Sequence, residues 1–318
     1  MAIRERNLDA QLRAMINGSS PGQGEIIHCV ESGGALHDYL KYQRPSDNVQ
    51  IGLQNAFNQA VTGRNDTIIL SPDSHSLAAS LTWNKNMTHL IGSYVGSREA
   101  IRNRIFMGTT FTPMVTVSGY GNTFANIYTG HGTATGDSVG WTITGNRNTF
   151  FRCNLAGPFN AAQAGNVGYV GVAVSGTETG FESCVIGADS IARDTSNSNL
   201  TQAYNTNTRL HDCDLLAMAS DANVVFITVL NTAGQTRLHL NSTRFYCMSA
   251  NWAISAAIAI AFSSTFPVGV FVDPGCCLYN IDQWCTAAAD QYGVWTPTFG
   301  DLTDADDILR ATRRSFTT

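Results

Sequence analysis

Charged side chains are scarce in this chain of 318 residues, and lysine is almost absent. Asp, Glu, Lys and Arg together make up 14% of the residues, and the only lysines are Lys41 and Lys85. An average soluble domain has about a quarter of charged residues. The formal net charge is −5, and the sequence has no basic stripe of the kind that contacts a phosphate backbone. We therefore expect no nucleic-acid partner.

Long apolar runs are also lacking. The segment from Ala253 to Phe262 is about half as long as the roughly 20 apolar residues that cross a bilayer. The opening residues, Met1 to Arg6, do not contain the apolar stretch of a secretory signal. We expect no membrane segment, and a protein made and kept in a reducing cytoplasm with its eight cysteines as free thiols.

The residues that are present point to an all-β protein, because Gly, Ser, Thr and Asn are abundant and β-branched runs are short. One six-residue pattern recurs with start-to-start offsets of 31, 29 and 30 residues. It reads apolar, two variable residues, a small Cys or Thr, one variable residue, apolar. The four copies are 150–155 (Phe-Phe-Arg-Cys-Asn-Leu), 181–186 (Phe-Glu-Ser-Cys-Val-Ile), 210–215 (Leu-His-Asp-Cys-Asp-Leu) and 240–245 (Leu-Asn-Ser-Thr-Arg-Phe). Self-similarity at such a period predicts stacked repeats that share one core.

The spacing within each copy predicts a bend. A flat strand would place Phe150 and Cys153 on opposite faces, so both can point inward only if the chain turns a corner between them. A short apolar run also precedes each corner. These runs are Met114 to Val117, Trp141 to Ile143, Tyr169 to Val174, Val224 to Val229 and Ile258 to Ile260. The pattern predicts a solenoid of parallel strands, with about eight coils stacked at about 4.8 Å into a rod about 40 Å long.

A resemblance to a known superfamily indicates the same fold. A helix, a strand running into a Pro-containing turn, and then 85–92 (Lys-Asn-Met-Thr-His-Leu-Ile-Gly) resemble the entry of pectin-lyase-like right-handed parallel β-helices. Asn122-Thr123-Phe124 and Asn148-Thr149-Phe150 continue in the same style. The resemblance covers roughly residues 45–290. It implies a single-stranded right-handed β-helix, in a superfamily that includes lyases, hydrolases and virion components.

The chain divides into three predicted parts. Residues 1–44 form an N-terminal arm and linker with a short helix over 3–16, and 296–318 form a C-terminal tail that also starts a helix. Residues 45–295 form the β-helix, with a capping helix at about 48–61 whose apolar face includes Leu53, Phe57, Ala60 and Val61.

Two polar segments interrupt the repeat. We expect Gly130–Asp137 and Ala188–Thr206 to project from the rod as loops. Trp284 and Trp295 are expected to cover the C-terminal end of the solenoid, because an uncapped coil exposes a sheet edge.

Asp212 and Asp214 are the best candidates for catalysis. They flank the inward Cys213 and so share the outer face, about 6–7 Å apart, which is a spacing that glycosidases use. However, Arg244 aligns with Asp214 one coil further on, so a cross-rung ion pair also explains a carboxylate there. Neighbouring coils supply Arg152, Asn154, Ser183 and Val185, which do not make an acidic cleft.

No other group of residues forms a site. His211 is expected to point away from the two aspartates, and a metal needs three or four ligands. Cys276, Cys277 and Cys285 lack a Cys-x-x-Cys pair or a nearby histidine, and we expect them to pack in the core. The sequence therefore predicts no catalytic, cofactor-binding or metal-binding residues, no cofactor, and no enzymatic activity.

The 85–92 entry and the Asn-Thr-Phe corners also resemble the short β-helix proteins of phage particles. This resemblance implies a structural virion protein of a tailed bacteriophage. In this hypothesis the protein is a capsid decoration or cement protein, made in the host cytoplasm and located on the virion. Its terminal arms bind the major capsid protein or other virion proteins, and it forms a homotrimer. The alternative is a tail-associated receptor-binding or polysaccharide-degrading β-helix protein.

Overall fold

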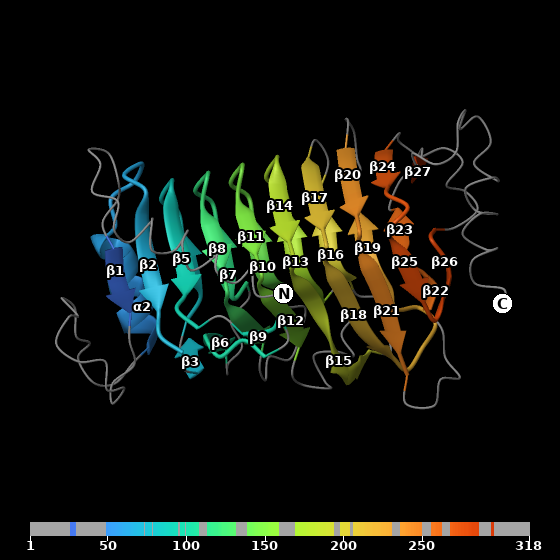
Figure 1. Cartoon of the computed structure of the whole chain (residues 1–318), viewed down its shortest axis with the longest axis horizontal. Coiled ribbons are helices and arrows are strands. Elements are labelled where there is room, and N and C mark those ends of the chain that lie inside the picture. The colour runs from blue at the N-terminus through green and yellow to red at the C-terminus, as the bar shows by residue number, and fades with distance from the viewer. Residues whose placement is uncertain are drawn as a thin grey trace, which may run out of the picture.

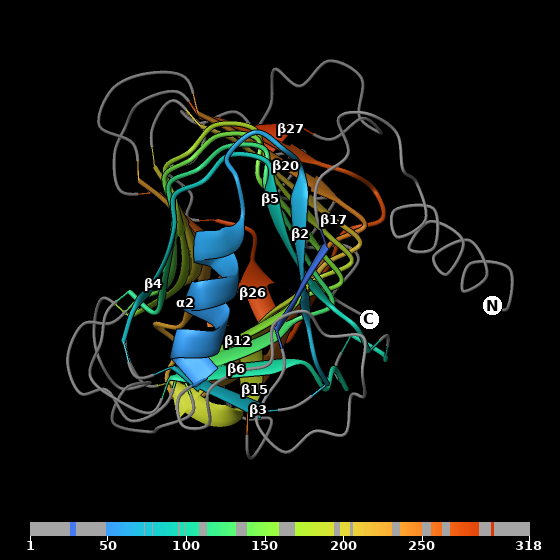
Figure 2. The same cartoon turned by 90° about the vertical axis from the view of Figure 1, so that its left-hand side faces the viewer.

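The fold is a parallel β-solenoid, seen from the side in Figure 1 and along its axis in Figure 2. This is a computed structural model. It describes residues 26–29, 49–72, 74–77, 79–94, 96–98, 100–107, 113–131, 139–158, 169–193, 198–203, 206–230, 236–249, 256–262, 268–285 and 294–295. The all-β prediction is confirmed. The predicted helical arms over 3–16 and from Thr303 lie outside the described residues, and membership of the pectin-lyase-like superfamily stays a prediction.

Each coil contributes one strand to each of three parallel sheets, from β2–β3–β4 to β20–β21–β23. The first sheet contains β1 (Ile26–Cys29), β2 (Asp66–Leu70), β5 (Thr88–Gly92), β8 (Thr123–Ala125), β11 (Thr149–Phe151), β14 (Thr179–Glu182), β17 (Asn207–His211), β20 (Thr236–Asn241), β24 (Val268–Val272) and β27 (Val294–Trp295). The second sheet contains β3 (Ser74–Leu77), β6 (Arg104–Met107), β9 (Tyr128–His131), β12 (Asn154–Pro158), β15 (Val185–Arg193), β18 (Asp214–Ala219), β21 (Arg244–Met248) and β25 (Cys277–Tyr279). The third sheet contains β4 (Leu81–Trp83), β7 (Val115–Val117), β10 (Val139–Ile143), β13 (Val170–Val174), β16 (Ser198–Gln202), β19 (Val225–Val229) and β23 (Ile260–Phe262). A further pair joins β22 (Ala256–Ile258) to β26 (Ile281–Gln283).

The predicted bend lies at the corner between the first and second sheets. One residue there adopts a left-handed backbone conformation in successive coils, with φ between 47° and 53°. These corner residues are Asn126, Arg152, Ser183, Asp212 and Ser242. The single left-handed residue turns the chain, so Phe150 and Cys153 both point into the core and are fully buried. The odd-then-even spacing of the repeat is therefore the spacing of a corner.

The core is a column of stacked side chains. The rings of Phe124, Phe150 and Phe181, from three consecutive coils, stack with centroids 4.9 and 5.0 Å apart. At the corner between the third and first sheets, buried asparagines link the coils. The Asn148 side chain accepts a hydrogen bond from the Asn122 amide and donates to the carbonyls of Gly119 and Gly145. These bonds satisfy backbone groups that the corner leaves without a sheet partner.

Helix α2 (Val49–Gln59) covers the N-terminal end of the rod, within the range expected for the capping helix (Figure 2). It buries Leu53 and Phe57, and the Phe57 ring lies 4.5 Å from that of Trp83. Val61, which we expected on this apolar face, lies beyond the helix and is 47% exposed. The Lys85 ammonium donates to the carbonyls of Phe57, Asn58 and Ala60, at 2.6, 2.9 and 2.6 Å. Lys85 therefore caps the C-terminal end of α2, where carbonyls lack intrahelical partners.

The structure differs from the sequence prediction at two further places. Strand β1 lies within the segment expected to be an arm and linker, and it pairs in parallel with β2. The predicted loop Ala188–Thr206 is wrong over most of its length, because β15 extends to Arg193 and β16 spans Ser198–Gln202. The polar residues of β16 are buried, and several make side-chain hydrogen bonds, as when Asn199 Nδ2 donates to the carbonyls of Ile186 and Leu216. The polar composition of this segment is therefore the reason why the sequence pattern did not predict a core strand there.

At the C-terminal end, Trp284 is 3% exposed and packs edge-on against Phe245 at 5.4 Å. This placement agrees with its expected covering role. The backbone of Trp295 belongs to β27, which pairs with β24. Gly130 and His131 are part of β9, and 132–137 of the first predicted loop lie outside the described residues.

Candidate functional site

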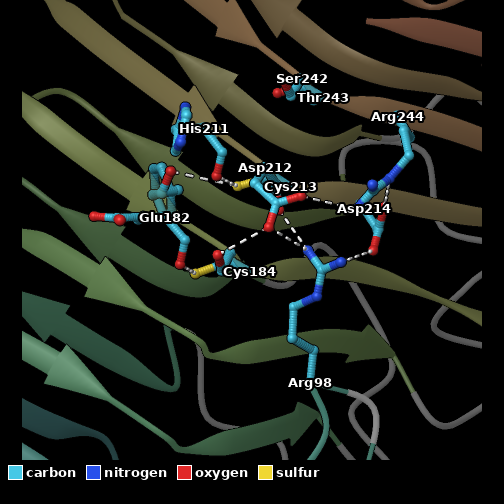
Figure 3. A network of polar contacts seen from close by, with 12 residues as sticks. Arg98, Glu182, Cys184, His211, Asp212, Cys213, Asp214, Ser242, Thr243 and Arg244 are labelled. Atoms are coloured by element: carbon cyan, nitrogen blue, oxygen red, sulfur yellow. Dashed lines mark hydrogen bonds and ion pairs between the residues drawn. The ribbon is translucent and has the colours of Figure 1, made fainter. Parts of the chain in front are cut away.

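The two candidate carboxylates lie side by side at the corner between the first and second sheets (Figure 3). Asp212 is the left-handed corner residue, with φ 49°, and Asp214 is the first residue of β18. Cys213 between them is fully buried, so both aspartates face outward as expected. Their side chains differ in exposure, at 37% for Asp212 and 11% for Asp214.

Arg244 engages both carboxylates from the next coil. It pairs in register with Asp214, and its Nε donates to Asp214 Oδ1. Its Nη2 lies 3.2 Å from Asp212 Oδ1. The hydrogen bond with Asp214 and the charges of both aspartates raise the pKa of Arg244, although partial burial acts against this. The predicted cross-rung ion pair is confirmed.

Arg98 is a residue of this network that the sequence did not reveal. Its Nη2 lies 3.2 Å from Asp214 Oδ2, and its Nη1 lies 3.7 Å from Asp212 Oδ2. The same side chain donates to the Asp212 carbonyl, 114 residues along the chain. Arg98 follows β5, whereas Asp212 and Asp214 belong to a coil four strands further along the first sheet. No spacing rule connects positions that far apart.

Ser183 and His211 are the other polar neighbours of the two aspartates, and neither supplies a further carboxyl group. Ser183 Oγ donates to Asp212 Oδ2 at 3.0 Å. His211 is exposed and lies apart from the two arginines in Figure 3, as expected. All four carboxylate oxygens of Asp212 and Asp214 thus face an arginine or serine donor. A glycosidase pair needs one carboxyl that gives its proton to the leaving oxygen, and this arrangement instead fits a structural ion-pair network.

The cysteines of the repeat are donors to the backbone. The thiols of Cys153, Cys184 and Cys213 lie 3.3–3.4 Å from carbonyls of the preceding coil, those of Phe124, Phe150 and Phe181. Thr243 Oγ1 makes the same bond to the Leu210 carbonyl at 3.2 Å. Burial raises the pKa of Cys184 and Cys213 well above the usual thiol range. Such thiols stay protonated and unreactive.

The other cysteines do not assemble a metal site in the described part of the chain. Cys247, Cys276 and Cys277 are free thiols, like those of the repeat. Cys285 is buried, whereas Cys277 is exposed, so core packing holds for only part of the predicted set. Burial raises the pKa of Cys276 to about 11. Among the described residues, no three His, Cys, Asp or Glu side chains lie close enough together to hold an ion.

A groove lies beside the ion-pair network, on the outer face of the second sheet. Its volume is about 580 Å³. Its lining includes Arg98, Asp214 and Arg244, and it continues past Tyr246 and Asn154 to Tyr128. We call it the second-sheet groove. None of the sequence patterns predicted it, because it combines residues from five coils with the segment after β5.

Comparison with known proteins gives a structural similarity. No family model and no curated protein sequence matches the chain. Among solved structures, ORF18 of Geobacillus virus E2 is similar in fold, with 12% sequence identity and a TM-score of 0.37. The alignment covers 79% of this chain and 57% of that protein, so the chain spans little more than half its length. A similarity at this level supports no functional assignment. No helix in the described part of the chain is long and apolar enough to cross a membrane.

Proposed function

We propose that this chain is a structural protein of a tailed-bacteriophage virion, without enzymatic activity, and that it decorates the capsid. The observation that carries the proposal is the state of Asp212 and Asp214. This outward carboxylate pair is the best candidate for hydrolysis that the sequence offers, yet every oxygen is engaged by Arg98, Arg244 or Ser183. The sequence resemblance to β-helix proteins of phage particles is the second support.

In this proposal the solenoid is a rigid body and the chain segments outside it provide attachment. The terminal segments 1–25, ahead of β1, and 296–318 bind the major capsid protein or other virion proteins, and the rod associates as a homotrimer. Wrapping segments gain affinity through large contact areas, at the cost of ordering the chain.

The direct test is the location of the protein in purified particles. Mass spectrometry should give a copy number comparable with that of the major capsid protein, and imaging should place the added density on the head. A variant lacking residues 1–20 should fold but fail to incorporate. If the truncated protein binds capsids as well as the full chain, attachment through the N-terminal arm is wrong.

A tail-associated, polysaccharide-degrading protein is the second candidate, and the second-sheet groove favours it. The full chain would be incubated with bacterial capsule or pectin-type polymers and assayed for new reducing ends or unsaturated products. Turnover that disappears in Asp212→Asn or Asp214→Asn would establish an enzyme and overturn our proposal. We expect no turnover.

A further inference from the structure

The outer face of the first sheet carries a cluster of basic side chains near its C-terminal end. Strands β17, β20, β24 and β27 lie side by side there (Figure 1). Arg209 is exposed on β17 and Arg237 is exposed on β20. His239 lies two residues from Arg237, on the same face of β20, and its backbone pairs in register with that of Arg209. We call Arg209, Arg237 and His239 the first-sheet basic patch.

Neither arginine of the patch has an acidic partner. Among the described residues, the guanidinium groups of Arg209 and Arg237 make no ion pair and no hydrogen bond. At the start of earlier strands in the same sheet, by contrast, Arg147 pairs with Glu178 of the next coil. Like charges on neighbouring strands repel each other and lower stability. The patch therefore carries positive charge that no described residue neutralises.

The pKa of His239 reflects the positive charge around it. Partial burial lowers this pKa, and the charges of Arg209 and Arg237 lower it further. Glu182, an acidic residue that is exposed on β14, pairs in register with His211 and not with the patch. A carboxylate that docked beside His239 would raise its pKa and would give both arginines a partner.

Phe271 adds an apolar surface to the patch. Its ring stacks on that of His239, with the centroids 4.6 Å apart and the planes 9° from parallel. The ring also lies over Gly269, where an added Cβ would be only 3.0 Å from Phe271 Cε2. Phe271 remains 36% exposed. Two unpaired guanidinium groups beside an exposed ring suit a peptide segment that carries several carboxylates and an apolar side chain.

One acidic segment of the chain fits this surface. Residues 301–307 (Asp-Leu-Thr-Asp-Ala-Asp-Asp) contain four aspartates, one leucine and no basic residue. The segment follows β27, in which the backbone of Trp295 pairs in register with that of Phe271. Three strand spacings, about 14 Å in total, separate β27 from Arg209 on β17. The connection from Trp295 to Asp301 spans up to about 20 Å when extended, so the segment reaches the patch of its own molecule.

We propose that residues 301–307 dock on the first-sheet basic patch of the same molecule. Aspartates of the segment accept hydrogen bonds from the guanidinium groups of Arg209 and Arg237, and Leu302 lies against the Phe271 ring. The short connection to β27 keeps the segment at a high effective concentration near the patch. A virion protein that binds 296–318 then competes with the patch for this segment. This last consequence rests on the proposed function, whereas the docking itself does not.

The pKa of His239, measured by NMR titration of the full chain at low salt, tests the docking. The His239 signal is assigned by its loss in His239→Gln. One full-length variant, called the Asn variant, combines Asp301→Asn, Asp304→Asn, Asp306→Asn and Asp307→Asn. It should lower the pKa of His239 by about 0.5 or more, because negative charge is removed from its surroundings. Asp221→Asn, which removes a carboxylate between β18 and β19, is the matched control and should leave this pKa unchanged.

A fluorescent peptide of residues 296–318 shows whether the patch is occupied. In titrations against full-length protein, the peptide should bind the Asn variant about tenfold or more tightly than the wild type, whose own segment blocks the patch. Adding Arg209→Gln and Arg237→Gln to the Asn variant should weaken this binding about tenfold or more. Adding Arg147→Gln instead is the matched control. Arg147 is exposed and already paired with Glu178, so its removal should leave peptide binding unchanged.

Three results would overturn the proposal. An equal pKa of His239 in the wild type and the Asn variant would show that the segment is not beside the patch. Equal binding of the peptide to both proteins would show that the patch is free for another partner. A pKa of His239 that changes with protein concentration would show that the segment comes from a second copy. The capsid-attachment experiment removes residues 1–20 and leaves 301–307 intact, so the two proposals fail independently.

Discussion

At the residue scale, one position of the repeat shows why Cys and Thr replace each other. Cys153, Cys184 and Cys213 are followed in the next coil by Thr243, and each donates to a carbonyl of the preceding coil. The site requires a small side chain with one hydrogen-bond donor. Neither redox chemistry nor metal binding is needed to explain these cysteines.

The buried thiols make stability depend on alkaline pH. The native pKa of Cys184 is raised well above 9.0, so the unfolded chain releases this proton first as pH rises. The stabilisation from Cys184 is therefore fully present below pH 9 and is lost as pH rises toward the native pKa. Each such thiol contributes a slope of about 1.4 kcal/mol per pH unit in that window.

We expect Cys184→Thr, which keeps the donor, to flatten this dependence by that amount. Urea midpoints of the wild type and the variant between pH 8 and pH 10.5, under reducing conditions, measure the effect. Cys277→Thr is the control, because Cys277 is exposed and its variant should follow the wild-type curve more closely. Equal slopes in all three proteins would contradict the prediction.

At the scale of elements, the corner between the first and second sheets was predictable because its spacing is constrained. In every copy of the repeat, the first apolar residue and the Cys or Thr both point inward although they are three residues apart, because a left-handed residue lies between them. The spacing of the pattern from Phe150 to Phe245 therefore indicates the corner directly. Strand β16 was missed because its hydrogen bonds are made by buried polar side chains, such as Asn199. Hydrophobic periodicity cannot detect a core strand whose buried side chains are polar and hydrogen-bonded.

The stability of the fold should depend on which side chain occupies the left-handed corner position. Ser242 has φ 47°, a conformation that a β-branched residue adopts only with strain. Ser242→Val should lower the free energy of unfolding by about 1–2 kcal/mol. Ser242→Asn, a residue that tolerates this conformation, should stay within about 0.5 kcal/mol. Chemical denaturation of the two variants checks the difference, and equal losses would show that the conformation is not the cause.

The capping helix depends on Lys85. Its ammonium bonds three carbonyls at the end of α2 and lies 4.8 Å from the Phe57 ring centroid. Lys85→Met should cost about 1–2 kcal/mol. Hydrogen exchange should accelerate in Val49–Gln59 before it does so in the central coils. Gln59→Ala, on the exposed side of α2, is the matched control and should leave exchange in the helix unchanged.

At the scale of the whole molecule, the segment after β5 ties distant coils together. Arg98 reaches Asp212 and Asp214 four coils away, and Arg152 Nη2 donates to the Gly96 carbonyl from a coil between them. Coils of a solenoid otherwise contact only their neighbours. Sequence patterns describe neighbours well, which is why they gave the rod and the Asp214–Arg244 pair but neither Arg98 nor the groove beside it.

Removing this long-range tie should have a small effect on stability and a larger one on cooperativity. Arg98→Ala should lower the free energy of unfolding by about 1 kcal/mol or less, since the network is partly exposed. It should also broaden the thermal transition measured by calorimetry, because distant coils are no longer coupled. Arg147→Ala is the control. Arg147 pairs with Glu178 between adjacent coils, and both side chains are exposed, so the width of the transition should not change. An unchanged width in Arg98→Ala would contradict a coupling role.

The parallel pairing of every coil with the next also determines how the rod bears mechanical load. The strands lie across the long axis, so the hydrogen bonds between coils point along it (Figure 1). A pull on one end of the chain along the axis loads only the outermost rung, which peels before the next is strained. A push along the axis, or a force across it, is shared by the whole stack. The protein is therefore suited to bearing compression and sideways load, and tension on its ends would unwind it one coil at a time.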